Sequence, residues 1–254
     1  MLEKFYGRRK GKALKPGRVI LMEKLLPQVS LKIPDVKKKG YLSPDEVIEE
    51  LHKEEVALEC LNMQDFFPEK KDDFCLEVGF GGGEHIAEMA LRSPKTGFLG
   101  AEVFVNGVAH LLALIGQVNQ DKSVSFQKGR VDNLRIFHED VRLLFPLLKR
   151  EAFSQIYVLF PDPWPKTRHE KRRFIGPKNL PVLASLLKKG GELIVATDVP
   201  LYAEWTESKV QESNLFELKN KEIRIRPKDW IPTRYEEKGI KAGRNPYYFV
   251  FTKK

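Results

Sequence analysis

The stretch FCLEVGFGGGEHIAEMAL, residues 74–91, joins a short apolar run, a cluster of glycines and an amphipathic run. The run at 74–78 is typical of a buried strand, and residues 84–91 have the apolar spacing of a helix. Glycines between a strand and a helix let a ligand approach the backbone, and the helix N-terminus offers unpaired N–H groups. The stretch therefore predicts a strand, a ligand-accessible loop and a helix.

The same alternation of apolar and amphipathic runs continues to the end of the chain. Further strands are expected at 97–101, 134–137, 156–160, 192–196, 216–225 and 247–252, and further helices at 108–118, 141–149 and 179–187. This order of elements predicts an α/β fold with a doubly wound, mostly parallel seven-stranded sheet of the Rossmann-like kind.

Residues 1–73 do not follow this alternation of apolar and amphipathic runs, because prolines interrupt them repeatedly. We expect a basic, partly helical N-terminal extension over 1–73, followed by the sheet domain over 74–254. Within the extension, the pattern predicts a helix at 44–61 with Ser43 as its N-cap.

The charge of the chain favours a polyanionic partner. Its formal net charge is +9, and the positive residues gather in two segments. Residues 4–18 hold seven lysines and arginines with no acid, and residues 166–178 hold six against Glu170 alone. Neutralising phosphates and releasing their counterions would give such segments affinity for nucleic acid, although a solvated surface is the alternative for either one.

Several features bear on the cellular setting. Cys60 and Cys75 stand in no metal or redox spacing, and no apolar run is long enough to span a bilayer. The N-terminus is basic and polar. We expect a cytoplasmic protein without a membrane span or a bound metal, and the sequence is compatible with either a monomer or a homodimer.

Acids follow the first three expected strands, at Glu77, Glu102 and Asp140. In an open α/β sheet such positions meet in one crevice, where Glu102 can accept the ribose hydroxyls of a nucleoside and Asp140 can reach an adenine amino group. Glu84 replaces the third glycine of the dinucleotide fingerprint, which argues against a nicotinamide cofactor. Glu77 suits a cofactor with an ammonium and a sulfonium but no phosphate. The pattern therefore predicts S-adenosylmethionine beside Gly79 and Gly81, although each acid taken alone is also compatible with a helix N-cap.

The segment FPDPWPK, residues 160–166, follows the fourth expected strand. Proline fixes its own φ and restricts the residue before it, so Asp162 and Trp164 lose little entropy on binding. The segment predicts a rigid site beside the cofactor. A stiff connector with Trp164 on the core is the structural alternative.

Taken with these motifs, the chain resembles the bacterial tRNA (guanine-N7)-methyltransferase family. The matching stretches are EVGFGGG at 77–83, FPDPWPK at 160–166, RHEKRRF at 168–174, ATD at 196–198 and TRYE at 233–236. The resemblance implies that residues 74–254 form a methyltransferase domain acting on N7 of a guanine, in the variable region of tRNA. It associates Glu77, Glu102, Asp140 and Asp162 with the methyl donor, and makes Asp162 the active-site acid. It associates Lys166, Asp198, Thr233, Arg234, Tyr235 and Glu236 with the substrate, and Arg168, His169, Glu170, Lys171, Arg172 and Arg173 with RNA.

Guanine N7 carries a lone pair and no proton, so we expect Asp162 to orient the base instead of removing a proton. Two other classes share parts of the pattern. One is a methyltransferase for a protein or a small molecule, which the basic segments disfavour. The other is a nucleotide-sensing RNA-binding protein without transferase activity, which would have no need of a rigid acid at this place.

Overall fold

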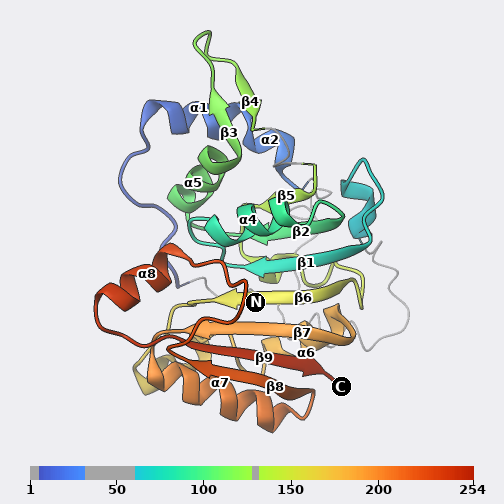
Figure 1. Cartoon of the computed structure of the whole chain (residues 1–254), viewed down its shortest axis with the longest axis vertical. Helices are drawn as coiled ribbons and strands as arrows, with labels where there is room; N and C mark the ends of the chain where they lie inside the picture. Colours follow the sequence, from blue (N-terminus) through green and yellow to red (C-terminus); the bar gives the residue numbers. More distant parts are fainter. Residues whose placement is uncertain (1–5, 32–60, 128–131) are drawn as a thin grey trace.

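The computed structural model describes residues 6–31, 61–127 and 132–254. Over these residues the chain forms a seven-stranded sheet of order β5-β2-β1-β6-β7-β9-β8 (Figure 1). The strands are β1 (Asp73–Val78), β2 (Thr96–Ala101), β5 (Leu134–Phe137), β6 (Phe153–Leu159), β7 (Leu187–Thr197), β8 (Phe216–Ile223) and β9 (Tyr247–Lys253). β9 runs antiparallel to β7 and β8, and the other pairings are parallel. The predicted fold class, a mostly parallel sheet with flanking helices, is confirmed.

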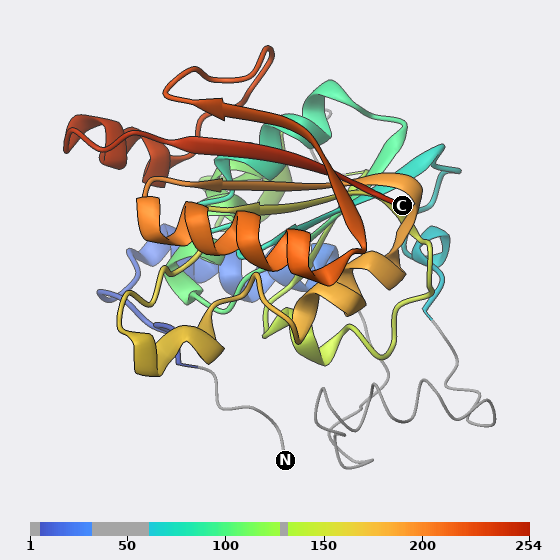
Figure 2. The same cartoon turned by 90° about the horizontal axis from the view of Figure 1, so that it is seen from below.

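Successive side chains of a strand point to opposite faces of the sheet, so each strand contributes to two separate hydrophobic cores. Leu76 and Val78 of β1 pack with α6 (Asn179–Leu186) and α7 (Pro200–Ser213), and Cys75 packs with α4 (Glu84–Arg92) and α5 (Val105–Ile115). Figure 2 shows α7 running along one face of the sheet. Both faces are therefore covered, and the carboxyl ends of the parallel strands are left as the edge where a ligand binds.

The described part of the N-terminal extension packs on the sheet domain. The helices α1 (Pro16–Lys24) and α2 (Leu26–Val29) bury Leu21, Leu25 and Val29 in the same core as α4 and α5. Before them, residues 6–12 cross the start of α5, where the backbone N–H of Val105 donates to the carbonyl of Arg9. The helix expected at 44–61 lies outside the described residues, and the division at residues 73 and 74 stays a prediction.

Several local expectations differ from the structure; β7, for example, begins at Leu187 and not at residue 192. Over the predicted helix 141–149 there is only a 3-10 turn, η3 (Val141–Leu143), because Pro146 lacks an N–H and disfavours helical backbone before it. The helix predicted to reach residue 118 ends at Ile115, where a hairpin of β3 (Gly116–Val118) and β4 (Val124–Phe126) begins. The fourth strand stops at Leu159 and not at residue 160, and β8 ends at Ile223 and not at residue 225.

The remaining elements are short or were not anticipated. They are η2 (Met63–Phe66), η4 (Thr167–Arg172) and α8 (Arg234–Lys241), the last of which contains most of the TRYE motif. Across the described ranges, no helix is both long and apolar enough to cross a membrane.

Candidate active site

A cavity of about 1190 Å³ opens at the carboxyl ends of the parallel strands. Its walls come from the segments that follow β1, β2, β5, β6 and β7, and from residues 6–8 of the extension. Among the predicted site residues, its lining contains Gly79, Gly81, Glu102, Asp140, Asp162, Asp198 and Tyr235. Residues from distant parts of the sequence thus meet at the edge where the sheet topology places a ligand.

The glycine loop is shaped by backbone that other residues rarely adopt. Gly79, Gly81 and Gly83 have φ values of 67°, 55° and 78°, in the left-handed region that glycine enters without a Cβ clash. Gly107 at the start of α5 lies so close that a Cβ there would be 2.1 Å from the carbonyl oxygen of Gly81. The loop and α5 are therefore held in tight contact beneath the cavity.

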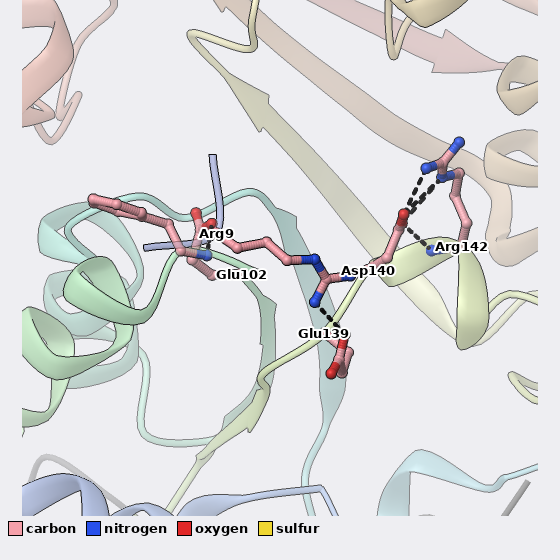
Figure 3. Close-up of polar contacts among 6 residues, drawn as sticks. Arg9, Glu102, Glu139, Asp140 and Arg142 are labelled. Carbon is pink, nitrogen blue, oxygen red and sulfur yellow. Dashed lines mark hydrogen bonds and ion pairs between the residues drawn. The ribbon is translucent and has the colours of Figure 1, made fainter. Parts of the chain in front are cut away.

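Glu102 is fixed by the glycine loop and by its own turn. Its two carboxylate oxygens accept the backbone N–H groups of Gly81, at 2.7 Å, and of Phe104, at 2.8 Å. Figure 3 shows this carboxylate and Asp140 beyond the ends of two neighbouring strands. Burial raises the pKa of Glu102, although the two backbone donors oppose this shift. A carboxylate oxygen has two lone pairs, and Glu102 lines the cavity, so the group can also accept from a ligand hydroxyl.

Asp140 combines two roles that the sequence left as alternatives. It is the N-cap of η3, accepting the backbone N–H of Arg142 at 3.0 Å, and it also lines the cavity. Its carboxylate forms an ion pair with the Arg142 guanidinium, whose Nη2 lies 2.6 Å from Oδ2 (Figure 3). Next to it, Glu139 pairs with Arg9 of the extension at 3.0 Å.

Glu77 does not line the cavity, although it was predicted there from the sequence. It is buried, and its Oε2 lies 2.7 Å from Nδ1 of His85 on α4. Side chains alternate between the two faces of a strand. Glu77 therefore points toward α4, on the face opposite to that of Leu76 and Val78.

The proline-rich segment after β6 is held in strained backbone. Phe160 and Trp164 have φ values of 51° and 42°, and each such residue costs about 1–3 kcal/mol, which the contacts of the surrounding structure must offset. The N–H of Phe160 donates to the carbonyl of Ala196 at 2.7 Å. Asp162 faces the cavity between these two residues, and desolvation by the surrounding protein raises its pKa.

Arg173 provides the second restraint on this segment. Its Nε donates to the carbonyls of Pro163 at 3.2 Å and Trp164 at 3.3 Å, and its guanidinium stacks over Trp205. Arg173 lines the cavity but is only 5% exposed, so the RNA contact associated with it stays a prediction. A buried guanidinium that satisfies loop carbonyls acts on the shape of the loop.

The rest of the basic segment lies at the surface or at the cavity mouth. Arg168 and Lys171 are exposed, whereas His169 and Glu170 are partly buried. Arg172 lies between two rings, 3.9 Å from the centroid of Tyr6 and 5.0 Å from that of Trp164. This contact was not anticipated from the sequence, and it brings the extension against the proline-rich segment.

The TRYE motif divides into supporting residues and residues at the surface. Thr233 and Glu236 are buried and form a capping box at the start of α8. Glu236 also accepts from Arg226, Trp230 and Tyr248. Tyr235 is 49% exposed and stands at the cavity, and Arg234 is exposed beside it. Tyr235 and Arg234 are therefore open to a ligand, whereas Thr233 and Glu236 hold the start of α8, and substrate binding by the motif stays a prediction.

The two other predicted substrate residues differ in position. Asp198 lines the cavity and accepts from Nε of Arg244 at 2.7 Å. Lys166 is exposed and lies outside the cavity lining. No group of three potential metal ligands occurs in the described ranges.

With this geometry established, similarity to known proteins assigns the family. A family model described as "Putative methyltransferase" matches residues 71–249. A tRNA (guanine-N(7)-)-methyltransferase of Paramagnetospirillum magneticum is 43% identical over 253 residues, covering 99% of this chain and 93% of the relative. The chain belongs to this methyltransferase family. An enzyme of the same description from Rhodospirillum rubrum is 38% identical, with 99% and 88% of the two chains covered.

Solved structures of methyltransferases share the fold. The 16S rRNA methyltransferase KamB superposes with a TM-score of 0.54 at 17% identity, covering 75% of this chain and 90% of the other. An antibiotic-related methyltransferase gives a TM-score of 0.52 at 16% identity, with coverages of 84% and 96%. At these identities the likeness concerns the Rossmann-like architecture alone.

Proposed function

We propose that this methyltransferase transfers the methyl group of S-adenosylmethionine to N7 of a guanine in tRNA. The observation that carries the proposal is the cavity that joins Glu102 and the glycine loop to the restrained Asp162. The names of its relatives, tRNA (guanine-N(7)-)-methyltransferases at 43% and 38% identity, support the same acceptor.

The chemistry of the cavity wall fits the methyl donor. Glu102 would accept the ribose hydroxyls, since its carboxylate is held rigidly beside Gly81. Asp140 would accept from the adenine amino group at the end of β5, while keeping its contact with Arg142. Asp162 would be the remaining carboxylate of this set. When bound, the donor supplies an electrophilic methyl group on a sulfonium.

The acceptor chemistry requires placement more than proton removal. Guanine N7 has an in-plane lone pair and no proton, so once aligned it would attack the methyl carbon directly while the S–C bond breaks and S-adenosylhomocysteine leaves. Asp162 would accept hydrogen bonds from N1–H and the exocyclic amine, and its negative charge would stabilise the cationic ring of the product. A carboxylate on restrained backbone suits this task, because the backbone that carries it does not have to reorganise during the reaction.

Access to a guanine inside a folded RNA requires that the base leave its stack. Trp164 and Tyr235 line the cavity, and either ring could stack on the extruded base. The exposed Lys171, which lines the cavity, and the exposed Arg168 three residues before it would contact phosphates and position the RNA without reading its sequence.

The test is incubation of unmodified tRNA with methyl-labelled S-adenosylmethionine, followed by cleavage chemistry specific for N7-methylguanine. We expect label at one guanine, and sequencing of the cleavage site tests whether that guanine lies in the variable region. Label on another base, or on protein but not RNA, would contradict the proposed reaction. A protein that binds both ligands without transfer would favour the RNA-binding alternative.

A further inference from the structure

A second cleft, of about 360 Å³, lies directly beside the active-site cavity. Its walls come from the extension and α1, from the glycine loop and α5, and from α8. Its basic lining residues are Arg8, Lys12, Arg18, His110, Arg234 and Lys238. Among the described residues that line it, none is acidic.

The positive charge of this cleft is not neutralised within the described chain. There, Lys12, Arg18, Arg234 and Lys238 form no ion pair with a carboxylate, unlike Arg226 and Arg244 nearby. An acid just outside the lining, Glu84, has its Oε1 3.7 Å from Nδ1 of His110. Gathering so many cations costs free energy through repulsion, which a bound anion would relieve.

The cleft is also preformed, because buried contacts or hydrogen bonds hold each of its walls in place. Asn106 clamps the extension: its Oδ1 accepts from the N–H of Gly11 and its Nδ2 donates to the carbonyl of Lys12, both at 2.7 Å. The opposite wall is the start of α8, which is held by the capping box of Thr233 and Glu236. The cations are thus presented by a preformed surface and not by a free tail.

The two cavities share a wall, to which Gly81, Phe104 and Tyr235 belong. Arg8 and Lys238 also line both. An anion in the basic cleft would therefore lie next to a base held in the active-site cavity against Tyr235. We propose that the cleft binds a backbone phosphate of the RNA next to the target guanosine, an assignment that rests on the proposed function.

The test removes two cations that line the cleft but not the active-site cavity, in the variant Lys12→Ala/Arg18→Ala. The matched control is Lys95→Ala/Lys189→Ala, which removes two exposed lysines at the amino ends of β2 and β7, the opposite edge of the sheet. We expect the cleft variant to bind unmodified tRNA about tenfold or more weakly than the control. Its plot of log affinity against log salt should also be shallower by about one for each phosphate that the variant no longer neutralises.

Two further measurements identify the ligand. Calorimetry should give the same affinity for S-adenosylmethionine in wild type, cleft variant and control, and thermal unfolding should show all three folded. A cleft variant that binds tRNA as the control does would overturn the proposal. If that variant instead bound only inorganic phosphate or only S-adenosylmethionine more weakly, the cleft would be a small-anion or donor site. Methylation by the wild type is assayed in parallel, because its absence contradicts the proposed function and not the cleft assignment.

Discussion

Substitution of Glu236 by glutamine tests whether this residue supports α8 from within the core. Glu236 is 0% exposed, and both of its carboxylate oxygens accept hydrogen bonds from other segments. Oε1 accepts from Nε of Arg226 and the hydroxyl of Tyr248, both at 2.6 Å. Oε2 accepts from Nε1 of Trp230 at 2.9 Å and the N–H of Thr233 at 3.3 Å.

The expected magnitude follows from the donors that a glutamine cannot serve. An amide nitrogen at the Oε2 position would face two N–H donors, whereas at the Oε1 position the hydroxyl of Tyr248 can rotate to accept. The glutamine therefore costs less with its NH2 group at the Oε1 position. In that orientation Nε of Arg226 still loses the oxygen that it donates to in the wild type. Because a hydrogen bond to a charged group contributes about 1.5–3 kcal/mol, we expect Glu236→Gln to lower the free energy of unfolding by about 2–3 kcal/mol. Glu236→Ala should cost about 3–5 kcal/mol, since it leaves Trp230, Tyr248 and the N–H of Thr233 without their acceptor and Arg226 with Glu237 alone.

The matched control is Glu237→Gln, the next residue on α8. Glu237 pairs with the same Arg226, but its side chain is 44% exposed, so the change should cost about 0–1 kcal/mol. Urea denaturation followed by far-UV circular dichroism measures both variants without relying on the fluorescence of Trp230. Equal unfolding midpoints for Glu236→Gln and Glu237→Gln would refute the supporting role.

Three other substitutions probe the cavity. Asp162→Asn should reduce single-turnover methyl transfer about 100-fold, because the negative charge is removed. Partial desolvation raises the pKa of Asp162, so ionising it opposes folding; because the residue is exposed, this variant should be only slightly more stable than wild type at neutral pH. That gain should vanish below the ordinary aspartate range, and urea melts at the two pH values check it. Arg173→Ala should lower the free energy of unfolding by about 3 kcal/mol, because it leaves loop carbonyls unpaired, and should not change the salt dependence of tRNA binding. Its counterpart Arg168→Ala should reduce that salt dependence and leave the free energy of unfolding unchanged. Gly107→Ala should weaken S-adenosylmethionine binding about tenfold or more by displacing the glycine loop, while Gly17→Ala, which meets open space, should leave calorimetric affinity unchanged.

Elements with strong local patterns were predicted from the sequence. The strands of the sheet were all anticipated. The five parallel ones contain the continuous apolar runs that are typical of buried strands, whereas β8 and β9 pair antiparallel and β8 is mostly exposed. α7 and α8 were not anticipated, since their apolar positions are few and α8 is mostly polar. The prediction of a helix at 141–149 was wrong. Its apolar spacing is typical of a helix, but Pro146 disfavours helical backbone in the turn before it.

The sequence also indicated which segments border the site, because acids at the ends of parallel strands must share one edge of the sheet. Glu102, Asp140 and Asp162 line the cavity accordingly. The positions of Asn106, Tyr6 and Arg8 carried no such signal. Their importance depends on the extension folding back over α5, a long-range contact that no local pattern encodes.

Local periodicity and backbone restriction are written into the amino-acid order, so the sheet, the glycine loop and the charged residues at the sheet edge could be predicted from it. Which charged side chains reach the cavity, and which are used inside the protein, depends instead on the folded arrangement. Glu77 hydrogen-bonds to His85, and Arg173 donates to the carbonyls of the proline-rich segment. Glu236 accepts hydrogen bonds from donors in other segments. A charged group can be buried only where distant partners satisfy it, and those partners come together only when the chain folds.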